Sequence, residues 1–337
     1  MTRYTRYERI INGVILICIA VYATNAYAQS DNILMRLKDA PYWQEQVAMG
    51  KLPPIEARLP TVPKIVTFDQ QNTKIGQHGG RIYSLMAKSK DTRQMVVYGY
   101  ARLIKYNQQF QLEADIAEDI IVEEGRRFII KLRPGHYWSD GQPFTSEDFR
   151  YWWEEIANNT ELYPAGPPNS LSLQGEMPKV TIVDAHTIIY EWQSPNPSFL
   201  SLLAASTPLY IYAPAHFMKQ FHINYQSSDT LEELVAQYSQ KSWSSLHTKM
   251  GKLYHNQVAQ LPSLQPWQLV SKLPTKRMVF KRNPYYHKID SKGQQLPYVD
   301  EWVINLVERK LIPLKAATGE VDLQGHIRKL VIDLHRN

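Results

Sequence analysis

The side chains able to act as acids, bases, nucleophiles or metal ligands are scattered along this sequence of 337 residues. His216 and His222 are six positions apart, a spacing that does not place two ligands on one helix face. Glu123-Glu124 and Glu154-Glu155 are adjacent pairs whose side chains point apart, so neither forms an acid–base pair. No G-x-S-x-G, H-E-x-x-H or G-x-x-x-x-G-K-[ST] motif occurs, and a single cysteine, Cys18, excludes disulfides and cysteine-based zinc sites. The sequence therefore predicts no catalytic residue, metal or cofactor.

Acidic residues near position 145 have structural explanations instead. Asp140 and Gly141 form a turn dipeptide. Thr145 and Asp148 have the [ST]-x-x-[DE] spacing of a capping box, so a helix should begin there. The apolar residues that follow lie on one helix face: Phe149, Trp152, Trp153 and Ile156. We therefore assign Asp140 to the turn and Thr145 to the helix cap.

Residues 1–28 have the layout of a secretory signal peptide. Three arginines precede an apolar stretch over about 10–23, and the small-x-small triplet Ala26-Tyr27-Ala28 predicts cleavage after Ala28. Cleavage leaves 309 residues, removes the cysteine and lowers the net charge from +6 to +4. An exported chain without cysteine fits the bacterial periplasm. The alternative is an uncleaved anchor helix, for which the apolar stretch is short.

Composition predicts a folded chain with a sizeable core. Hydrophobic residues make up 44% and charged residues 21%, which argues against disorder and against a polytopic membrane protein. Tyr and Trp total 29 residues, which suits the binding of sugars, peptides and other extended ligands; core packing is the alternative explanation. Lys and Arg do not cluster along the sequence, which argues against nucleic acid as a partner.

Short strands and helices alternate, which indicates an α/β or mixed α+β fold. The segment 29–78 is rich in proline and predicted to be extended chain on a surface, with a short helix near 42–49. Strands are predicted at 82–87, 127–133, 180–183, 187–192, 268–273, 277–282 and 299–308, the last leaving the region of the others. Helices are predicted at 95–106, 145–156 and 199–205, with partial helix in 226–257 and a strand or loop at 208–214.

Several motifs, taken together, resemble one protein family. The longest is LRPGHYWSDGQPFTSEDF at residues 132–149. Shorter ones follow in order: VDxxT at 183–187, PxH at 214–216, KRNPYY at 281–286, GQQLPYVD at 293–300 and GEVD at 319–322. Over roughly 79–325 the chain resembles the family 5 extracellular solute-binding proteins, the periplasmic receptors of oligopeptide, dipeptide and nickel ABC importers.

The resemblance implies a type II periplasmic-binding-protein-like fold, mainly its N-terminal lobe. It divides the mature chain into an extended N-terminal segment (29–78), the N-terminal lobe (79–297) and the start of the crossover to a second lobe (298–337). The sequence stops about a dozen residues after the GEVD motif. Nearly all of lobe two would then be missing, through a frameshift or premature stop, or because the protein is a shortened single-lobe form.

By the same resemblance, the expected function is capture of oligopeptides or similar solutes by a monomer that delivers them to ABC permease subunits in the inner membrane. Tyr98, Tyr100 and Trp267 are the expected cleft-facing aromatic residues, with core packing as the alternative. The family's Gly-Thr-Gly-Pro-Tyr loop reads LPSLQPW at residues 261–267, so only its Pro-aromatic end is retained. Alternatives to solute capture are a non-functional fragment, a chaperone-like periplasmic module and an exported hydrolase.

Overall fold

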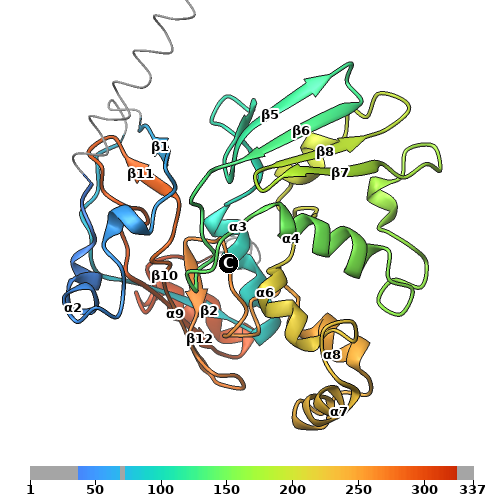
Figure 1. The fold of residues 1–337 in the computed structure, drawn as a ribbon. Coiled ribbons are helices and arrows are strands. Elements are labelled where there is room, and N and C mark those ends of the chain that lie inside the picture. Colours follow the sequence, from blue (N-terminus) through green and yellow to red (C-terminus); the bar gives the residue numbers. More distant parts are fainter. Residues whose placement is uncertain (1–36, 69–72, 325–337) are drawn as a thin grey trace, which may run out of the picture.

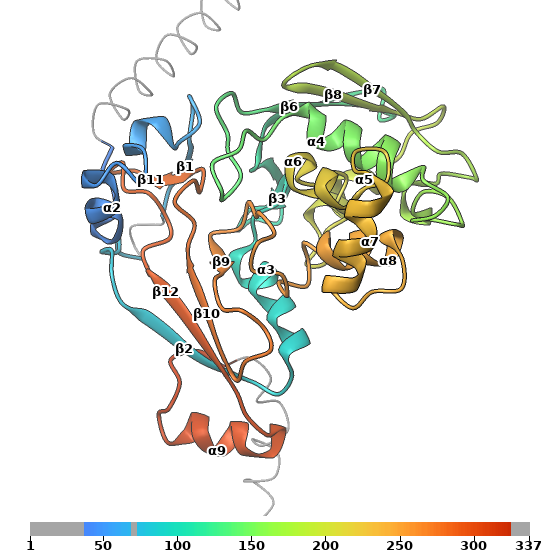
Figure 2. The same ribbon diagram turned by 60° about the horizontal axis from the view of Figure 1, so that its bottom comes forward.

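The computed structural model describes residues 37–68 and 73–324, and two four-stranded sheets organise them (Figure 1). The predicted signal peptide and its cleavage site lie outside the described residues. One sheet lies with helix α4 against its face, and the other runs toward helix α9 (Figures 1 and 2). Among the described residues, no helix is long and apolar enough to cross a membrane.

The first sheet is antiparallel throughout, in the order β5-β6-β8-β7. Its strands are β5 (Ala117–Glu123), β6 (Arg127–Leu132), β7 (Lys179–Asp184) and β8 (Thr187–Glu191). Alternate residues of β6, namely Phe128, Ile130 and Leu132, are buried in the largest apolar core. This alternation is the pattern that predicted the strand, and the prediction is confirmed.

The second sheet has the order β2-β12-β10-β9, with β12 parallel to β2 and antiparallel to β10. Its strands are β2 (Arg81–Met86), β9 (Trp267–Leu269), β10 (Arg277–Arg282) and β12 (Glu301–Leu306). The predicted hairpin of β9 and β10 is confirmed. The prediction that the last strand leaves this region is wrong. Trp302, Val303 and Ile304 are consecutive buried residues, which is the pattern of an inner strand covered on both faces. The sheet therefore continues past residue 297.

The N-terminal segment is packed into the protein and is not extended chain on its surface. It forms α2 (Gln44–Ala48), two short 3-10 turns (Pro41–Trp43 and Ile55–Ala57) and β1 (Lys64–Val66), which pairs in parallel with β11 (Lys288–Asp290). Arg58 is fully buried and donates hydrogen bonds to the carbonyl oxygens of Pro53 (2.9 Å) and Pro284 (2.6 Å). These bonds tie the segment to the end of β10, which proline content alone does not predict.

The helix predicted over 95–106 is shorter than expected. Helix α3 (Gln94–Gly99) follows a 3-10 turn (Ser89–Arg93) and ends where Tyr100 adopts a left-handed conformation, with φ 41°. A Cβ on Gly99 would lie 2.8 Å from Pro266, so the helix end needs glycine for this close approach. The chain then forms β3 (Ile104–Tyr106), antiparallel to β4 (Leu112–Ala114).

Of the remaining helices, α4 to α8 lie on the side of the first sheet and α9 lies at the far end of the second sheet (Figure 2). They are α4 (Ser146–Tyr151, continued by a π-helical turn over Trp152–Ala157), α5 (Phe199–Ala204), α6 (Ala215–Met218), α7 (Ser228–Gln237), α8 (Trp243–Met250) and α9 (Ile312–Ala317). The capping box is confirmed: Glu147 N–H donates to Thr145 Oγ1, and Thr145 N–H donates to Asp148 Oδ2. Residues 208–214 form a loop.

Candidate functional site

Two of the three aromatic residues predicted to contact ligand meet at a third aromatic ring. Tyr98 stacks on Trp302, with ring centres 5.2 Å apart and an interplanar angle of 4°. Trp267 packs edge-on against the same indole at 5.3 Å. Tyr98 and Trp267 are half-buried, and burial raises the pKa of Tyr98 above its ordinary value. The sequence did not single out Trp302, whose place between β2 and β10 depends on long-range strand pairing.

Tyr100, the third predicted residue, lies apart from this aromatic group. Its hydroxyl donates to the carbonyl oxygen of Ala204 (2.8 Å) and accepts from the backbone N–H of Tyr106 (3.3 Å). The guanidinium of Arg102 lies 5.0 Å from its ring centre. The polar end of Tyr100 is therefore already occupied by the fold.

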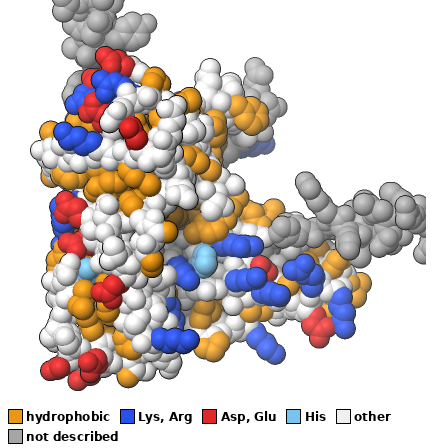
Figure 3. Space-filling view, turned by 90° about the vertical axis from the view of Figure 1, so that its right-hand side faces the viewer, with side chains coloured by type: hydrophobic (Ala, Val, Ile, Leu, Met, Phe, Trp, Pro, Cys, Tyr) orange, Lys and Arg blue, Asp and Glu red, His pale blue; other side chains and the backbone are white. Residues whose placement is uncertain are grey.

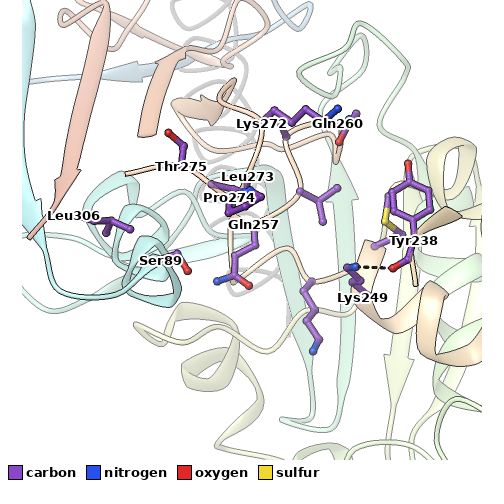
Figure 4. A pocket seen from close by; sticks show the side chains of 14 residues that line it. Ser89, Tyr238, Lys249, Gln257, Gln260, Lys272, Leu273, Pro274, Thr275 and Leu306 are labelled. Carbon is purple, nitrogen blue, oxygen red and sulfur yellow. Dashed lines mark hydrogen bonds between the residues drawn. The ribbon is translucent and has the colours of Figure 1, made fainter. Parts of the chain in front are cut away.

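A cavity of about 520 Å³ lies beside the aromatic group, between the β9–β10 turn, the 3-10 turn before α3, and the end of α8 (Figure 4). We call it the lysine pocket. Its polar lining consists of Ser89, Tyr238, Lys249, Lys252, Gln257, Gln260, Lys272 and Thr275. Its apolar lining includes Ala259, Leu273 and Leu306, which pack against the same apolar cluster as Tyr98 and Trp267. The predicted aromatic residues thus lie behind this pocket and do not line it.

The lysine pocket carries positive charge without a carboxylate in its lining. Within the described chain, no carboxylate oxygen lies within 4.0 Å of the ammonium groups of Lys249, Lys252 or Lys272. Lys249 Nζ donates to the carbonyl oxygen of Tyr238 (3.2 Å), the bond drawn in Figure 4. Figure 3 shows that Lys and Arg side chains gather on the centre and right of one face, with fewer acidic ones among them.

A second cavity, of about 530 Å³, lies beside the π-helical turn and is lined by aliphatic, aromatic and polar side chains. Its aromatic residues are Trp152, Tyr163, Tyr210, Tyr212 and Tyr254. Burial raises the pKa of Tyr210 to about 12. The hydroxyl of Tyr254 accepts from Thr207 Oγ1 (3.0 Å). Lys252 lines both cavities.

The buried titratable groups near α4 are satisfied within the fold. Asp148 accepts hydrogen bonds from Trp138 Nε1 (3.1 Å) and from the backbone N–H of Ala215 (2.9 Å), besides its cap. Burial raises its pKa to about 6. Asp140 accepts from the N–H of Gln142 as predicted for a turn, and its other oxygen lies 2.8 Å from His216 Nε2. Asp148 is thus buried and bonded within the fold, whereas Asp140 is exposed beside His216.

The histidines do not form a metal site in the part of the chain that the structure describes. No group of three or more His, Cys, Asp or Glu side chains there has the arrangement of a metal centre. His222 is fully buried, and its Nδ1 accepts a hydrogen bond from the backbone N–H of Asn224 (3.1 Å).

Comparison with known sequences gives one consistent family. Residues 111–333 match the family described as bacterial extracellular solute-binding proteins, family 5, middle. The periplasmic alpha-galactoside-binding protein of Rhizobium meliloti is 25% identical over 324 residues, which are 89% of this chain and 44% of the relative. The periplasmic murein peptide-binding protein MppA of Escherichia coli is 28% identical over 114 residues, 30% of this chain and 21% of MppA.

Solved structures give the same fold. An oligopeptide-binding protein OppA superposes with a TM-score of 0.77 at 29% identity, over 86% of this chain and 44% of OppA. The periplasmic binding protein MelB of Agrobacterium fabrum, solved with stachyose, superposes with a TM-score of 0.70 at 22% identity, over 89% of this chain and 45% of MelB. The chain thus spans less than half the length of these relatives and has the mixed α/β fold of type II periplasmic binding proteins. The family match and these likenesses together show that the chain belongs to the bacterial extracellular solute-binding proteins of family 5.

Proposed function

We propose that this chain is the periplasmic solute-capturing component of an ABC importer, which binds oligopeptides or similar solutes and delivers them to permease subunits in the inner membrane. The observation that carries the proposal is the likeness to OppA, at 29% identity over 86% of this chain. The protein performs no chemistry on its solute. It reaches the periplasm through the predicted signal peptide, cleaved after Ala28.

The solute class rests on the relatives and on the aromatic surfaces. The relatives include binding proteins for alpha-galactosides and for murein peptides, so sugars and peptides are the solutes to test. We propose that solute lies against the Tyr98–Trp302–Trp267 group, since Tyr98 and Trp267 are only half-buried. Tyr100 is the weakest of the three proposed contacts, because its hydroxyl is bonded to the backbone.

The same proposal assigns roles to parts of the chain. Residues 79–297 supply the body of the N-terminal lobe, and 29–78 lie against it. Residues 298–337 begin the crossover, with β12 already part of the sheet of that lobe. A solute would then contact the lobe at the β9 edge of this sheet, at the end of the hairpin where Trp267 pairs with Arg282.

The test is expression of the full sequence in a bacterium, purification from the periplasm and N-terminal sequencing. A new terminus at Gln29 is expected. Binding of short peptides and of galactosyl oligosaccharides is then measured by ligand-observed NMR, which detects dissociation constants of about 1 mM and tighter. Trp267→Leu should weaken binding about tenfold, and Trp243→Leu, on α8, is the matched control.

Three results would count against the proposal. Absence of binding to every peptide and oligosaccharide rejects solute capture. Hydrolysis of the added peptides or esters favours the exported hydrolase. Retention of unfolded clients without small-solute binding favours the chaperone-like module.

A further inference from the structure

We propose that the lysine pocket binds a small solute carrying several carboxylates. This inference rests on the proposed function, in that it presumes solute capture, and it names the chemical class of the solute. Acidic oligopeptides and acidic oligosaccharides share this chemistry, and the experiment below separates them.

The cations of the pocket come from separate parts of the chain. Lys249 is near the end of α8, Lys252 follows that helix, and Lys272 lies in the β9–β10 turn. Lys249 and Lys252 are three residues apart in the sequence, and the fold adds Lys272 from the hairpin to the same cavity lining.

The lining of the lysine pocket holds three lysines and no carboxylate. Arg150 on α4, by contrast, lies 2.7 Å from Glu147 and also pairs with Glu154. The three lysines are exposed, so their ammonium groups are accessible to a ligand. An anionic ligand in the pocket would gain attraction from these ammonium groups. Charge complementarity is thus the argument for an anionic occupant.

The neutral lining fits an organic acid better than a bare ion. Gln257, Gln260 and Thr275 offer amide and hydroxyl groups for the polar parts of a solute. Leu273 and Leu306, opposite Tyr238 and Lys249 in Figure 4, offer apolar surface for its carbon skeleton. The volume of about 520 Å³ lies within the range of small-molecule sites, about 300–1,000 Å³. A solute with several carboxylates on a carbon frame uses each of these features.

The experiment titrates the purified, exported protein with matched acidic and neutral probes. The pairs are triglutamate against triglutamine, and trigalacturonate against a neutral galactose trisaccharide, each at low and at raised salt. At least one acidic probe should bind about tenfold more tightly than its neutral partner, and the difference should shrink with salt. The acidic probe that binds identifies the solute as peptide or saccharide.

Variants then locate the site. Lys252→Gln with Lys272→Gln should weaken acidic-probe binding about tenfold or more. The matched control is Lys131→Gln with Lys179→Gln, two exposed lysines on the first sheet, which should leave binding unchanged. Circular dichroism checks that both double variants are folded.

Each other outcome overturns the inference. Tight binding of neutral probes that the pocket variant leaves unchanged rejects an anionic solute while the proposed function stands. Absence of binding to all probes rejects both. Equal binding of inorganic phosphate would mean an adventitious ion only. Sedimentation with phosphatidylglycerol vesicles, without binding of acidic probes, would mean that the pocket faces a membrane.

Discussion

Two charged regions of this protein differ in how their charges are balanced. In the buried region around Asp115, the carboxylate is fully buried, and its Oδ1 lies 2.7 Å from Lys288 Nζ and 3.5 Å from His287 Nε2. In the lysine pocket, Lys252 and Lys272 are exposed and no carboxylate within the described residues pairs with them. A buried charge must be paired for the chain to fold, whereas an exposed one is available to a ligand. The comparison separates charges that hold the fold from charges that are available for binding.

A second buried ion pair lies between neighbouring strands of the second sheet. Arg282 is fully buried, and its Nη1 lies 3.0 Å from Asp300 Oδ1. Burial lowers the pKa of Arg282 to about 10, an effect that the charge of Asp300 opposes. Arg282 is the last residue of β10, and Arg58 is buried close to the residues that follow it. The ion pair joins the end of β10 to the start of β12, and the hydrogen bond of Arg58 to Pro284 attaches the N-terminal segment beside it.

The largest expected effect comes from removing the buried carboxylate. Asp115→Asn leaves the ammonium of Lys288 buried without a partner, because both side chains are almost inaccessible. Breaking a buried pair from one side typically costs about 3–5 kcal/mol. We therefore expect Asp115→Asn to lower the free energy of unfolding in urea by an amount of that order.

A double variant controls for the loss of packing. Asp115→Leu with Lys288→Met replaces both charges by apolar groups and should recover much of the lost stability. If the single and double variants are equally unstable, the ion pair does not hold this region together. If Asp115→Asn has the same free energy of unfolding as the unmodified protein, the buried carboxylate does not hold the fold. The contrast between the buried region and the lysine pocket is then wrong.

Neither charged region could be predicted from the sequence, and the reason is the same for both. Asp115 and Lys288 lie 173 positions apart, and they meet because β1 pairs in parallel with β11 and the β3–β4 hairpin lies next to them. The lysine pocket likewise joins a turn, a helix end and a hairpin. The sequence does not show this lining because Lys272 joins Lys249 and Lys252 only through the fold.

Local signals were sufficient where the interaction itself is local. The capping box at Thr145 and the alternation in β6 depend on neighbouring residues, and both are confirmed. The helix over 95–106 was overestimated because its end depends on Arg102. The guanidinium of Arg102 donates to the carbonyl oxygens of Val96 (3.1 Å) and Ser206 (2.9 Å), which fixes the turn after Gly99. A contact with residue 206 leaves no recognisable pattern in the sequence near residue 100.

Lowering the pH should reduce the free energy of unfolding through the buried region around Asp115 and not through the lysine pocket. Burial is the main cause that lowers the pKa of His287 from 6.5 to about 4. The unfolded chain then binds a proton at higher pH than the folded one, so stability falls as the pH drops from about 6.5 toward 4. For His287 alone the loss by pH 4 is roughly 3 kcal/mol. Asp115, whose pKa Lys288 and His287 lower despite its burial, adds a further loss below about pH 4.

Urea unfolding at several pH values between about 7 and 4 measures this loss. His287→Gln removes the titrating group and should flatten the dependence, although His136, whose ring centre lies 4.9 Å away, is also buried with a lowered pKa. A pH profile that is the same in the variant would show that His287 does not titrate in this range. The lysine pocket has no buried acid in its lining, so it should contribute nothing to the profile.

The smallest expected effect comes from neutralising one cation at the protein surface. One variant removes a cation that has carboxylate partners, and the other removes a cation that has none. Arg150→Gln removes the ion pairs with Glu147 and Glu154 on α4 and should lower the free energy of unfolding by about 0.5–1 kcal/mol. Lys272→Gln removes a cation that has no carboxylate partner in the described chain, so the change should stay within about 0.5 kcal/mol and be, if anything, stabilising. Urea unfolding of both variants at low salt, where charge effects are largest, measures the difference. Equal destabilisation by the two substitutions would mean that Lys272 contributes to the fold, because a cation available for a ligand can be neutralised without loss of folding stability.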